Sequence, residues 1–107
     1  MLLTTVYRHY RSYMSMNCIL RIQCSHPAIV MLMSDGDYER YLSKLGANFH
    51  GGYFHHFPVD LKAPWPDNWN IILEPTECRQ DQLDYSILFI KKEANLMKKA
   101  DKKIMVS

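Results

Sequence analysis

Apolar and polar residues alternate along residues 17–24. In an extended chain, one side would carry Cys18, Leu20, Ile22 and Cys24. Arg21 and Gln23 would lie on the other side. A period of two residues is typical of a strand with one buried face. Residues 17–24 are therefore predicted to form a half-buried strand.

The next segment, residues 28–33, is a continuous apolar run with no alternation. Its β-branched residues and the turn residues on either side favour a strand that is buried on both faces. Ser25-His26-Pro27 separates it from the preceding strand, and Pro27 offers no backbone amide for a sheet hydrogen bond. We expect the two strands to form a hairpin.

Residues 38–45 carry their apolar positions at helical spacing, namely Tyr38, Tyr41, Leu42 and Leu45. This spacing predicts one amphipathic helix of about two turns. The preceding residues 34–37 supply side-chain oxygens that can cap its first turn. Gly46 follows the last apolar position and is expected to end the helix in a left-handed conformation.

Short apolar or alternating segments recur along the rest of the chain and predict further strands near residues 6–9, 59–63, 69–73 and 83–90. With six or seven short strands and one short helix, the fold class is all-β, as a small β-sandwich or barrel. We expect a single β domain over residues 1–91. Residues 92–107 form a lysine-rich C-terminal tail, helical or frayed.

The segment His50–Pro58 is unusual, because it holds three of the five histidines and two of the four glycines. Glycines permit positive φ angles or close backbone approach, so a strand can turn a corner of a sandwich here. A ligand pocket needs the same concavity together with aromatic walls and a few polar groups. The two interpretations are compatible. The predicted ligand-binding residues are His26, His50, Gly51, Gly52, Tyr53, His55, Trp69 and Asn70.

A metal site is not expected. Cys24 and His26 would share one side if their strand continued, but no CxxC, HxxxH or HExxH spacing is present. His55 and His56 would point to opposite faces of a strand, so only one of them could join a metal site. We predict neither a metal nor another cofactor.

Nucleophilic catalysis has one candidate, Cys24 or Ser25 activated by a histidine such as His26. Neighbouring side chains on a strand diverge, which argues against a Ser25–His26 dyad. Cys24 shares its side with apolar residues and is expected to be a buried, inert thiol. No catalytic residue is assigned, and a small hydrolase using cysteine and histidine stays the alternative function.

The composition indicates the type of domain and its cellular compartment. The chain has 107 residues, of which 48% are hydrophobic and 22% charged, as in a soluble domain with one modest core. No apolar run is long enough to span a bilayer, and the first residues meet Arg8 too early for a signal peptide. Three irregularly spaced cysteines argue against a disulfide scaffold. A cytoplasmic protein with reduced thiols is expected.

The net charge of +2 is unevenly distributed. Residues 91–107 contain six lysines and two acidic residues, Glu93 and Asp101, so their net charge is +4. Residues 1–90 therefore have a net charge of −2. Nucleic-acid binding through this tail is an alternative function that we do not expect, because lysine-rich termini often serve solubility alone and the body is mildly acidic.

An ordered set of short motifs covers residues 7–91. It comprises His9-Tyr10, Cys24-Ser25-His26, Met31-Leu32-Met33, Asp35 with Tyr38 and Tyr41, Phe49-His50-Gly51-Gly52, Phe57-Pro58, Pro64, Trp69-Asn70 and Tyr85-Ser86-Ile87. In this set the chain resembles the bacterial family called domain of unknown function eighteen-eighty-three. The resemblance implies a compact, mostly β domain with a role in sensing or recognition, and it supplies no catalytic residues.

The function best supported by the sequence is non-enzymatic recognition of a ligand or a protein partner at the glycine–histidine segment. Exposed edges of a small sandwich can also pair between copies, which makes a homodimer a further expectation.

Overall fold

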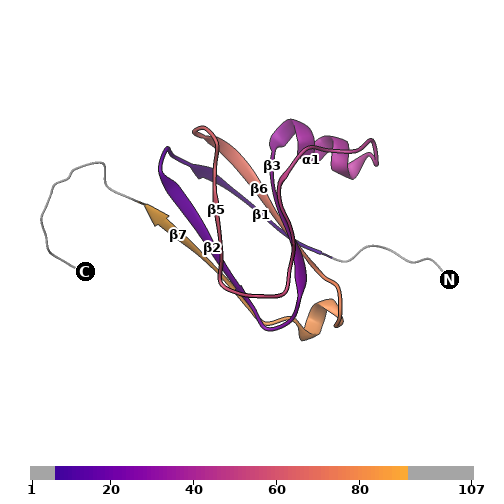
Figure 1. Cartoon of the computed structure of the whole chain (residues 1–107). Coiled ribbons are helices and arrows are strands. Elements are labelled where there is room, and N and C mark those ends of the chain that lie inside the picture. The colour runs from indigo at the N-terminus through magenta and orange to yellow at the C-terminus, as the bar shows by residue number, and fades with distance from the viewer. Residues whose placement is uncertain (1–6, 92–107) are drawn as a thin grey trace, which may run out of the picture.

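The computed structural model describes residues 7–91, which form seven strands, one α-helix and one short 3-10 helix (Figure 1). The elements in chain order are β1 (Arg8–Met14), β2 (Cys18–Cys24), β3 (Ala28–Ser34), α1 (Asp35–Leu42), β4 (His50–Phe54), β5 (Val59–Lys62), β6 (Asp67–Pro75), η1 (Gln80–Gln82) and β7 (Tyr85–Lys91). The all-β class predicted from the sequence is confirmed.

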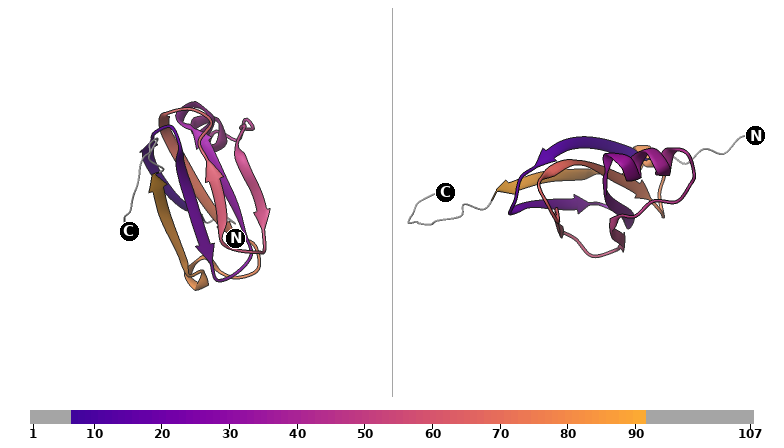
Figure 2. Two further views of the ribbon diagram at one scale, coloured as in Figure 1. Left: turned by 60° about the vertical axis from the view of Figure 1, so that its left-hand side comes forward. Right: turned by 90° about the horizontal axis from the view of Figure 1, so that it is seen from above.

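The strands form two antiparallel sheets that lie as layers, one over the other (Figure 2). Sheet A has the strand order β1-β6-β3-β4, and sheet B has the order β5-β2-β7. Apart from β3 and β4, paired strands are not consecutive in the chain, so the fold depends on long-range pairing. The architecture is the expected β-sandwich.

The main core lies between the sheets, where alternate residues of facing strands meet. Its buried members from β2, β3 and β6 are Cys18, Leu20, Ile22, Cys24, Ala28, Val30, Leu32, Trp69, Ile71 and Leu73. The predicted inward face of β2 is therefore confirmed, and Trp69, only 1% exposed, is the largest fully buried side chain.

The predicted hairpin of β2 and β3 is wrong. β2 pairs with β5 and β7 in sheet B, whereas β3 pairs with β6 and β4 in sheet A. The turn at residues 25–27 carries the chain from one sheet to the other. The Ser25 amide donates to the Asp84 carbonyl, 2.8 Å away, and the Thr76 amide donates to the Pro27 carbonyl, 3.3 Å away. Alternation predicted the strands but not their partners.

A second, smaller core covers the outer face of sheet A. Met31, Met33 and Ile72 are buried there, and Tyr38 and Tyr41 of α1 pack against them. β3 is therefore buried on both faces, as its continuous apolar run predicts. The other two apolar positions of the expected helix, Leu42 and Leu45, are exposed instead.

The helix begins and ends earlier than its pattern predicts. Ser34 is the N-cap, and its hydroxyl accepts from the Asp37 amide over 3.2 Å, which confirms the capping assignment. At the other end, Lys44 rather than Gly46 is the left-handed residue next to the C-cap, with φ 59°. The amide of Leu45 donates to the Arg40 carbonyl over 2.9 Å, the hydrogen bond of a Schellman motif. Gly46 also has a positive φ but lies beyond this cap.

The remaining boundaries differ by a few residues. β1 continues to Met14, β6 begins at Asp67, and β7 begins at Tyr85 after the turn of η1. Within residues 7–91, no helix has the length and apolar character to cross a membrane. The predicted lysine-rich tail lies outside the described residues.

Candidate functional site

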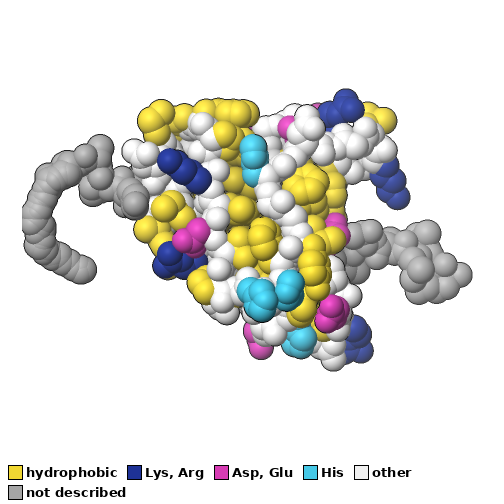
Figure 3. Space-filling model, viewed as in Figure 1, with side chains coloured by type: hydrophobic (Ala, Val, Ile, Leu, Met, Phe, Trp, Pro, Cys, Tyr) yellow, Lys and Arg dark blue, Asp and Glu magenta, His cyan; other side chains and the backbone are white. Residues whose placement is uncertain are grey.

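The eight predicted ligand-binding residues do not converge on one site. His50 and Trp69 meet at one end of the sandwich, Tyr53 and His55 lie at the β4–β5 turn, and His26 lies at the β2–β3 turn. On the face in Figure 3, one histidine patch stands alone near the top and the other histidine side chains lie near the bottom. Each place is therefore described separately.

One cavity brings His50 and Trp69 together with residues that the prediction missed. We call it the indole pocket; its volume is about 200 Å³, and it is lined by Ser34, Asp37, Asn48, Phe49, His50, Trp65 and Trp69. These residues come from the start of α1, the approach to β4, the β5–β6 loop and β6. The pocket therefore joins four segments that are distant in sequence.

Two indole rings form much of the pocket wall. The centroids of Trp65 and Trp69 lie 5.1 Å apart with the rings tilted by 54°. The Trp69 Nε1 donates to the Trp65 carbonyl over 3.1 Å, and the Trp65 Nε1 donates to an Asp67 carboxylate oxygen over 3.2 Å. Trp65 is 50% exposed, so one indole is part of the core and the other faces solvent.

His50 and Phe49 add two further rings. His50 begins β4 and presents its ring edge-to-face to Trp69, with centroids 5.9 Å apart and planes at 71°. Phe49, the preceding residue, is exposed. Several aromatic residues, of which Trp65, Phe49 and His50 are exposed, thus border one small volume.

Asp37 is the only carboxylate of the pocket lining. The Asn48 backbone amide donates to its Oδ1 over 3.2 Å, and the Ser34 hydroxyl donates to its Oδ2 over 3.1 Å. These neutral donors fix the carboxylate between the helix start and the approach to β4. No lysine or arginine lines the pocket.

The two glycines of β4 have different surroundings. Gly51 has φ +123°, and a Cβ built on it would lie 2.1 Å from the Val30 carbonyl oxygen. A side chain there would collide with the backbone of β3. Gly52 has φ +153° but has open space around the same position. Gly51 thus permits the close approach of β4 to β3, one strand position after His50.

The other histidines of the segment face away from the indole pocket. Tyr53 stacks on His55 at 5.8 Å, and the rings of His55 and His56 lie only 4.2 Å apart. The expectation that His55 and His56 diverge is wrong, because both lie in the turn after β4 rather than on a strand. The Tyr53 hydroxyl donates to a carboxylate oxygen of Glu77 over 3.2 Å.

His26 contacts Ser25, with 2.8 Å between Nδ1 and the hydroxyl oxygen. The expected divergence of these neighbours is also wrong, because they occupy the turn after β2. The Ser25 hydroxyl accepts from the Asp84 amide over 2.9 Å. Its contacts therefore join the β2–β3 turn to the segment before β7.

Cys24, the candidate nucleophile, is buried in the main core. Burial, with a smaller contribution from Cys78, raises the pKa of the Cys24 thiol to about 11. A thiol with this pKa carries almost no thiolate at neutral pH and is a poor nucleophile. Its position matches the expectation of a buried thiol.

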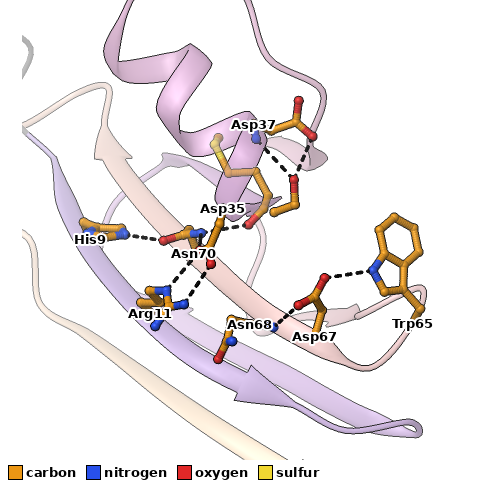
Figure 4. Close-up of polar contacts among 10 residues, drawn as sticks. His9, Arg11, Asp35, Asp37, Trp65, Asp67, Asn68 and Asn70 are labelled. Carbon is orange, nitrogen blue, oxygen red and sulfur yellow. Dashed lines mark hydrogen bonds and ion pairs between the residues drawn. The ribbon is translucent and has the colours of Figure 1, made fainter.

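Asn70 belongs to a different place again, the outer face of sheet A (Figure 4). Its side-chain oxygen lies 2.8 Å from the Nε2 of His9, and its amide nitrogen donates to Asp35 over 2.8 Å and to the Met33 carbonyl over 3.3 Å. The His9 ring stacks on Tyr38 with centroids 4.1 Å apart. Asn70 thus links β1, β3, β6 and α1.

Arg11 completes this outer-face network. It donates two hydrogen bonds to the carboxylate of Asp35, of 2.9 and 2.8 Å. The hydrogen bonds from Arg11 and then Asn70 lower the pKa of Asp35 to about 2. Figure 4 shows that Asp37, two residues later, points away from this network. Sequence reasoning missed the network, since only the β1–β6 register places Arg11 opposite Asn70.

A larger groove, of about 370 Å³, lies between the open edges of the two sheets. Tyr10 and Ser12 of β1 line it together with Tyr85, Ile87 and Phe89 of β7. Its two tyrosine hydroxyls hydrogen-bond to each other. The groove is largely apolar and more open than the indole pocket, and it contains no carboxylate. We therefore favour the indole pocket as the candidate site.

Within residues 7–91, no group of three or more histidine, cysteine, aspartate or glutamate side chains is arranged to hold a metal ion. His55 and His56 lie close together at the β4–β5 turn. Tyr53 stacks on His55, and its hydroxyl donates to Glu77.

Comparison with known proteins identifies the family. No curated protein and no solved structure matches the chain. A family model described as "Domain of unknown function (DUF1883)" matches residues 5–92, which is most of the chain. It covers every strand of the sandwich, α1 and the indole pocket. The protein is therefore a member of the DUF1883 family.

Proposed function

We propose that this protein is a non-enzymatic recognition module that binds a small organic ligand in the indole pocket. The observation that carries the proposal is the convergence of Trp65, Trp69, Phe49 and His50 with Asp37 on one cavity. Aromatic walls with a few placed polar groups are the usual composition of small-molecule sites.

Several hydrogen bonds support a preformed pocket. Asn48 is tied to Asp37, and Trp65 is tied both to Asp67 and to the buried Trp69. A site whose walls are already fixed loses less conformational entropy when a ligand binds. The half-exposed indole of Trp65 supplies apolar surface that a ligand can cover.

We also propose a cytoplasmic location in a bacterium. The resemblance described above supports the source. The thiols of Cys18, Cys24 and Cys78 are free, which fits a reducing compartment.

The proposal is tested by recording amide and indole N–H signals in two-dimensional NMR spectra during titration. The probes are choline, methyl glucoside and benzoate, which represent a cation, a neutral sugar and an anion. At least one probe should shift the indole signals of Trp65 and Trp69 saturably. Trp65→Ala should weaken that binding about tenfold or more, since it removes one wall.

Tyr13→Ala is the matched control, because Tyr13 is an exposed aromatic residue outside the indole pocket. It should leave binding unchanged. Absence of saturable shifts at both indoles with every probe would overturn the proposal, as would equal effects of the two variants.

A further inference from the structure

We propose that the ligand of the indole pocket is a compact organic cation with a quaternary ammonium group. This inference rests on the proposed function, since it names the ligand class for the same pocket. It follows from the charge of the lining, from the aromatic faces, from the hydrogen bonds already made there, and from the size of the cavity.

The charge of the lining favours a cation. Asp35 and Asp37 lie in the same turn of α1, but the carboxylate of Asp35 is paired with the guanidinium of Arg11. Asp37 receives only neutral donors, the Ser34 hydroxyl and the Asn48 amide. Its negative charge is therefore left without a cationic partner at the pocket, and an anionic ligand would be repelled.

The aromatic faces also favour a cation. A cation over the face of a ring is attracted by the ring quadrupole, and tryptophan gives the strongest effect. Of the rings that line the pocket, Trp65, Phe49 and His50 are exposed and can meet a ligand, whereas the buried Trp69 supports them through its contacts with Trp65 and His50. The exposed rings come from two segments, the β5–β6 loop and the start of β4, and border the same small volume, where they can contact a compact group.

The charged, hydroxyl and indole groups of the lining are already hydrogen-bonded, and its remaining polar side-chain groups are the Asn48 amide and the His50 ring. Both indole N–H groups donate to protein oxygens, and both oxygens of Asp37 accept from Ser34 and Asn48. A sugar needs a donor or acceptor for each of its hydroxyls, because unpaired polar groups are costly to bury, and Asn48 and His50 supply only a few. A quaternary ammonium group has no N–H and needs only the negative charge and the ring faces.

The volume of about 200 Å³ sets the size of the group. Pockets for drug-sized molecules span about 300–1,000 Å³, so only a small group fits inside this one. A trimethylammonium group meets this limit, and the rest of its molecule would extend into solvent past the exposed ring of Trp65.

Tryptophan fluorescence tests the inference directly, because both tryptophans of the chain line this pocket. The full chain is titrated with choline chloride and, in parallel, with sodium chloride at the same concentrations. Choline should change the emission saturably beyond the sodium chloride control. Its neutral isostere 3,3-dimethyl-1-butanol should bind about tenfold more weakly or not at all, because it lacks the charge.

Two variants separate charge from folding. Asp37→Asn keeps one of the two acceptor oxygens and the size of the side chain but removes the charge, and it should weaken choline binding about three- to tenfold. Asp60→Asn makes the same charge change on sheet B, away from the pocket, and should leave choline binding unchanged. The far-ultraviolet circular dichroism of both variants confirms that they fold.

The outcomes distinguish this inference from the proposed function. Equal binding of choline and its neutral isostere would overturn the cation and leave a pocket that selects by shape. Binding of methyl glucoside or benzoate in place of choline would overturn the ligand class but support the recognition module. A failure of all probes in both fluorescence and NMR would overturn the inference together with the proposed function.

A trimethylammonium group can belong to a free metabolite or to a trimethylated lysine of another protein. A short peptide with trimethyl-lysine, compared with its unmodified form, separates the two sources. Tighter binding of choline than of the methylated peptide supports a free ligand, and the reverse supports a protein partner. Either order supports the ligand class.

Discussion

The outer faces of the two sheets differ in how far other elements cover them. On sheet A, α1 covers Met31, Met33 and Ile72 and creates a second buried cluster. On sheet B, the outward residues of β2 and β7 that the structure describes include Arg21 and Leu88, and both are exposed. The inner faces form one shared core, so the difference lies in what one short helix adds.

The two faces also differ in the hydrogen bonds that surround an arginine–aspartate ion pair. Arg11 and Asp35 on sheet A are joined by bonds of 2.9 and 2.8 Å, and Arg21 and Asp60 on sheet B by bonds of 2.7 and 2.8 Å. Their direct geometry is nearly equal. Asp35, however, also accepts from the buried Asn70. The surroundings of an ion pair therefore distinguish the two better than the pair itself does.

The largest expected effect comes from truncating an apolar residue on each outer face. Ile72→Ala should lower the free energy of unfolding by about 2–5 kcal/mol, because Ile72 is 0% exposed and its removal leaves a cavity below α1. Leu88→Ala should change it by less than about 0.5 kcal/mol, because Leu88 is 56% exposed. Urea denaturation of both variants measures the difference. Similar decreases in the free energy of unfolding for the two variants would contradict the stated difference in burial between the two faces.

A smaller effect is expected from the polar residues of each face. Asn70→Ala should cost about 1–3 kcal/mol, because it leaves the Met33 carbonyl and the ring nitrogen of His9 without this partner. Gln23→Ala, at an exposed position of sheet B, is the control and should cost less than about 0.5 kcal/mol. The same denaturation experiment measures both. A negligible cost for Asn70→Ala would mean that the outer-face network adds no stability.

The smallest effect concerns acid. The pKa of Asp35 is about 2 in the folded protein against an ordinary 3.8, so the stabilisation from its contacts is complete above pH 3.8 and is lost as the pH falls toward 2. The difference in unfolding free energy between the wild type and Asp35→Asn should shrink over this interval. Arg21 lowers the pKa of Asp60 as well, but no buried amide assists, so Asp60→Asn should show a weaker trend.

Urea denaturation between pH 5 and pH 2 measures both trends. Solvent exposure of the two pairs keeps the effects small. A stronger trend for Asp60→Asn than for Asp35→Asn would contradict the role given to Asn70.

Local pattern was sufficient for the strands other than β4, but not for their partners. The alternation in residues 17–24 predicts β2 and its buried side, because one face of an extended chain must enter the core. The turn before Pro27 looks like a hairpin, yet the chain crosses to the other sheet there. Nothing local distinguishes a turn within a sheet from a crossing between sheets, since both need the same residues.

The end of α1 shows the same limit. Gly46 is the expected left-handed residue by propensity, but Lys44 adopts that conformation. Tyr38 and Tyr41 pack on the outer face of sheet A, whereas Leu42 and Leu45, nearer the helix end, are exposed. Tertiary contacts therefore override a local preference of about 1 kcal/mol.

The candidate site was half predictable. The sequence predicts the polar residue His50 and the aromatic residue Trp69 as ligand-binding residues, and they do line the same cavity. Asp37 was predicted only as a helix cap, a correct local description that hides its place in the pocket, and Trp65 was not predicted as a site residue. The signal that could have found Trp65 was its position between two prolines, which hold an aromatic side chain in a fixed loop.

The backbone of Gly51 and Gly52 also bears on self-association. β4 is an edge of sheet A, and a regular edge offers a row of free amides and carbonyls to which a second molecule can add a strand. Positive φ angles at two consecutive residues turn the peptide groups out of that row. The same backbone that lets Gly51 approach β3 thus also makes this edge a poor template for adding a strand.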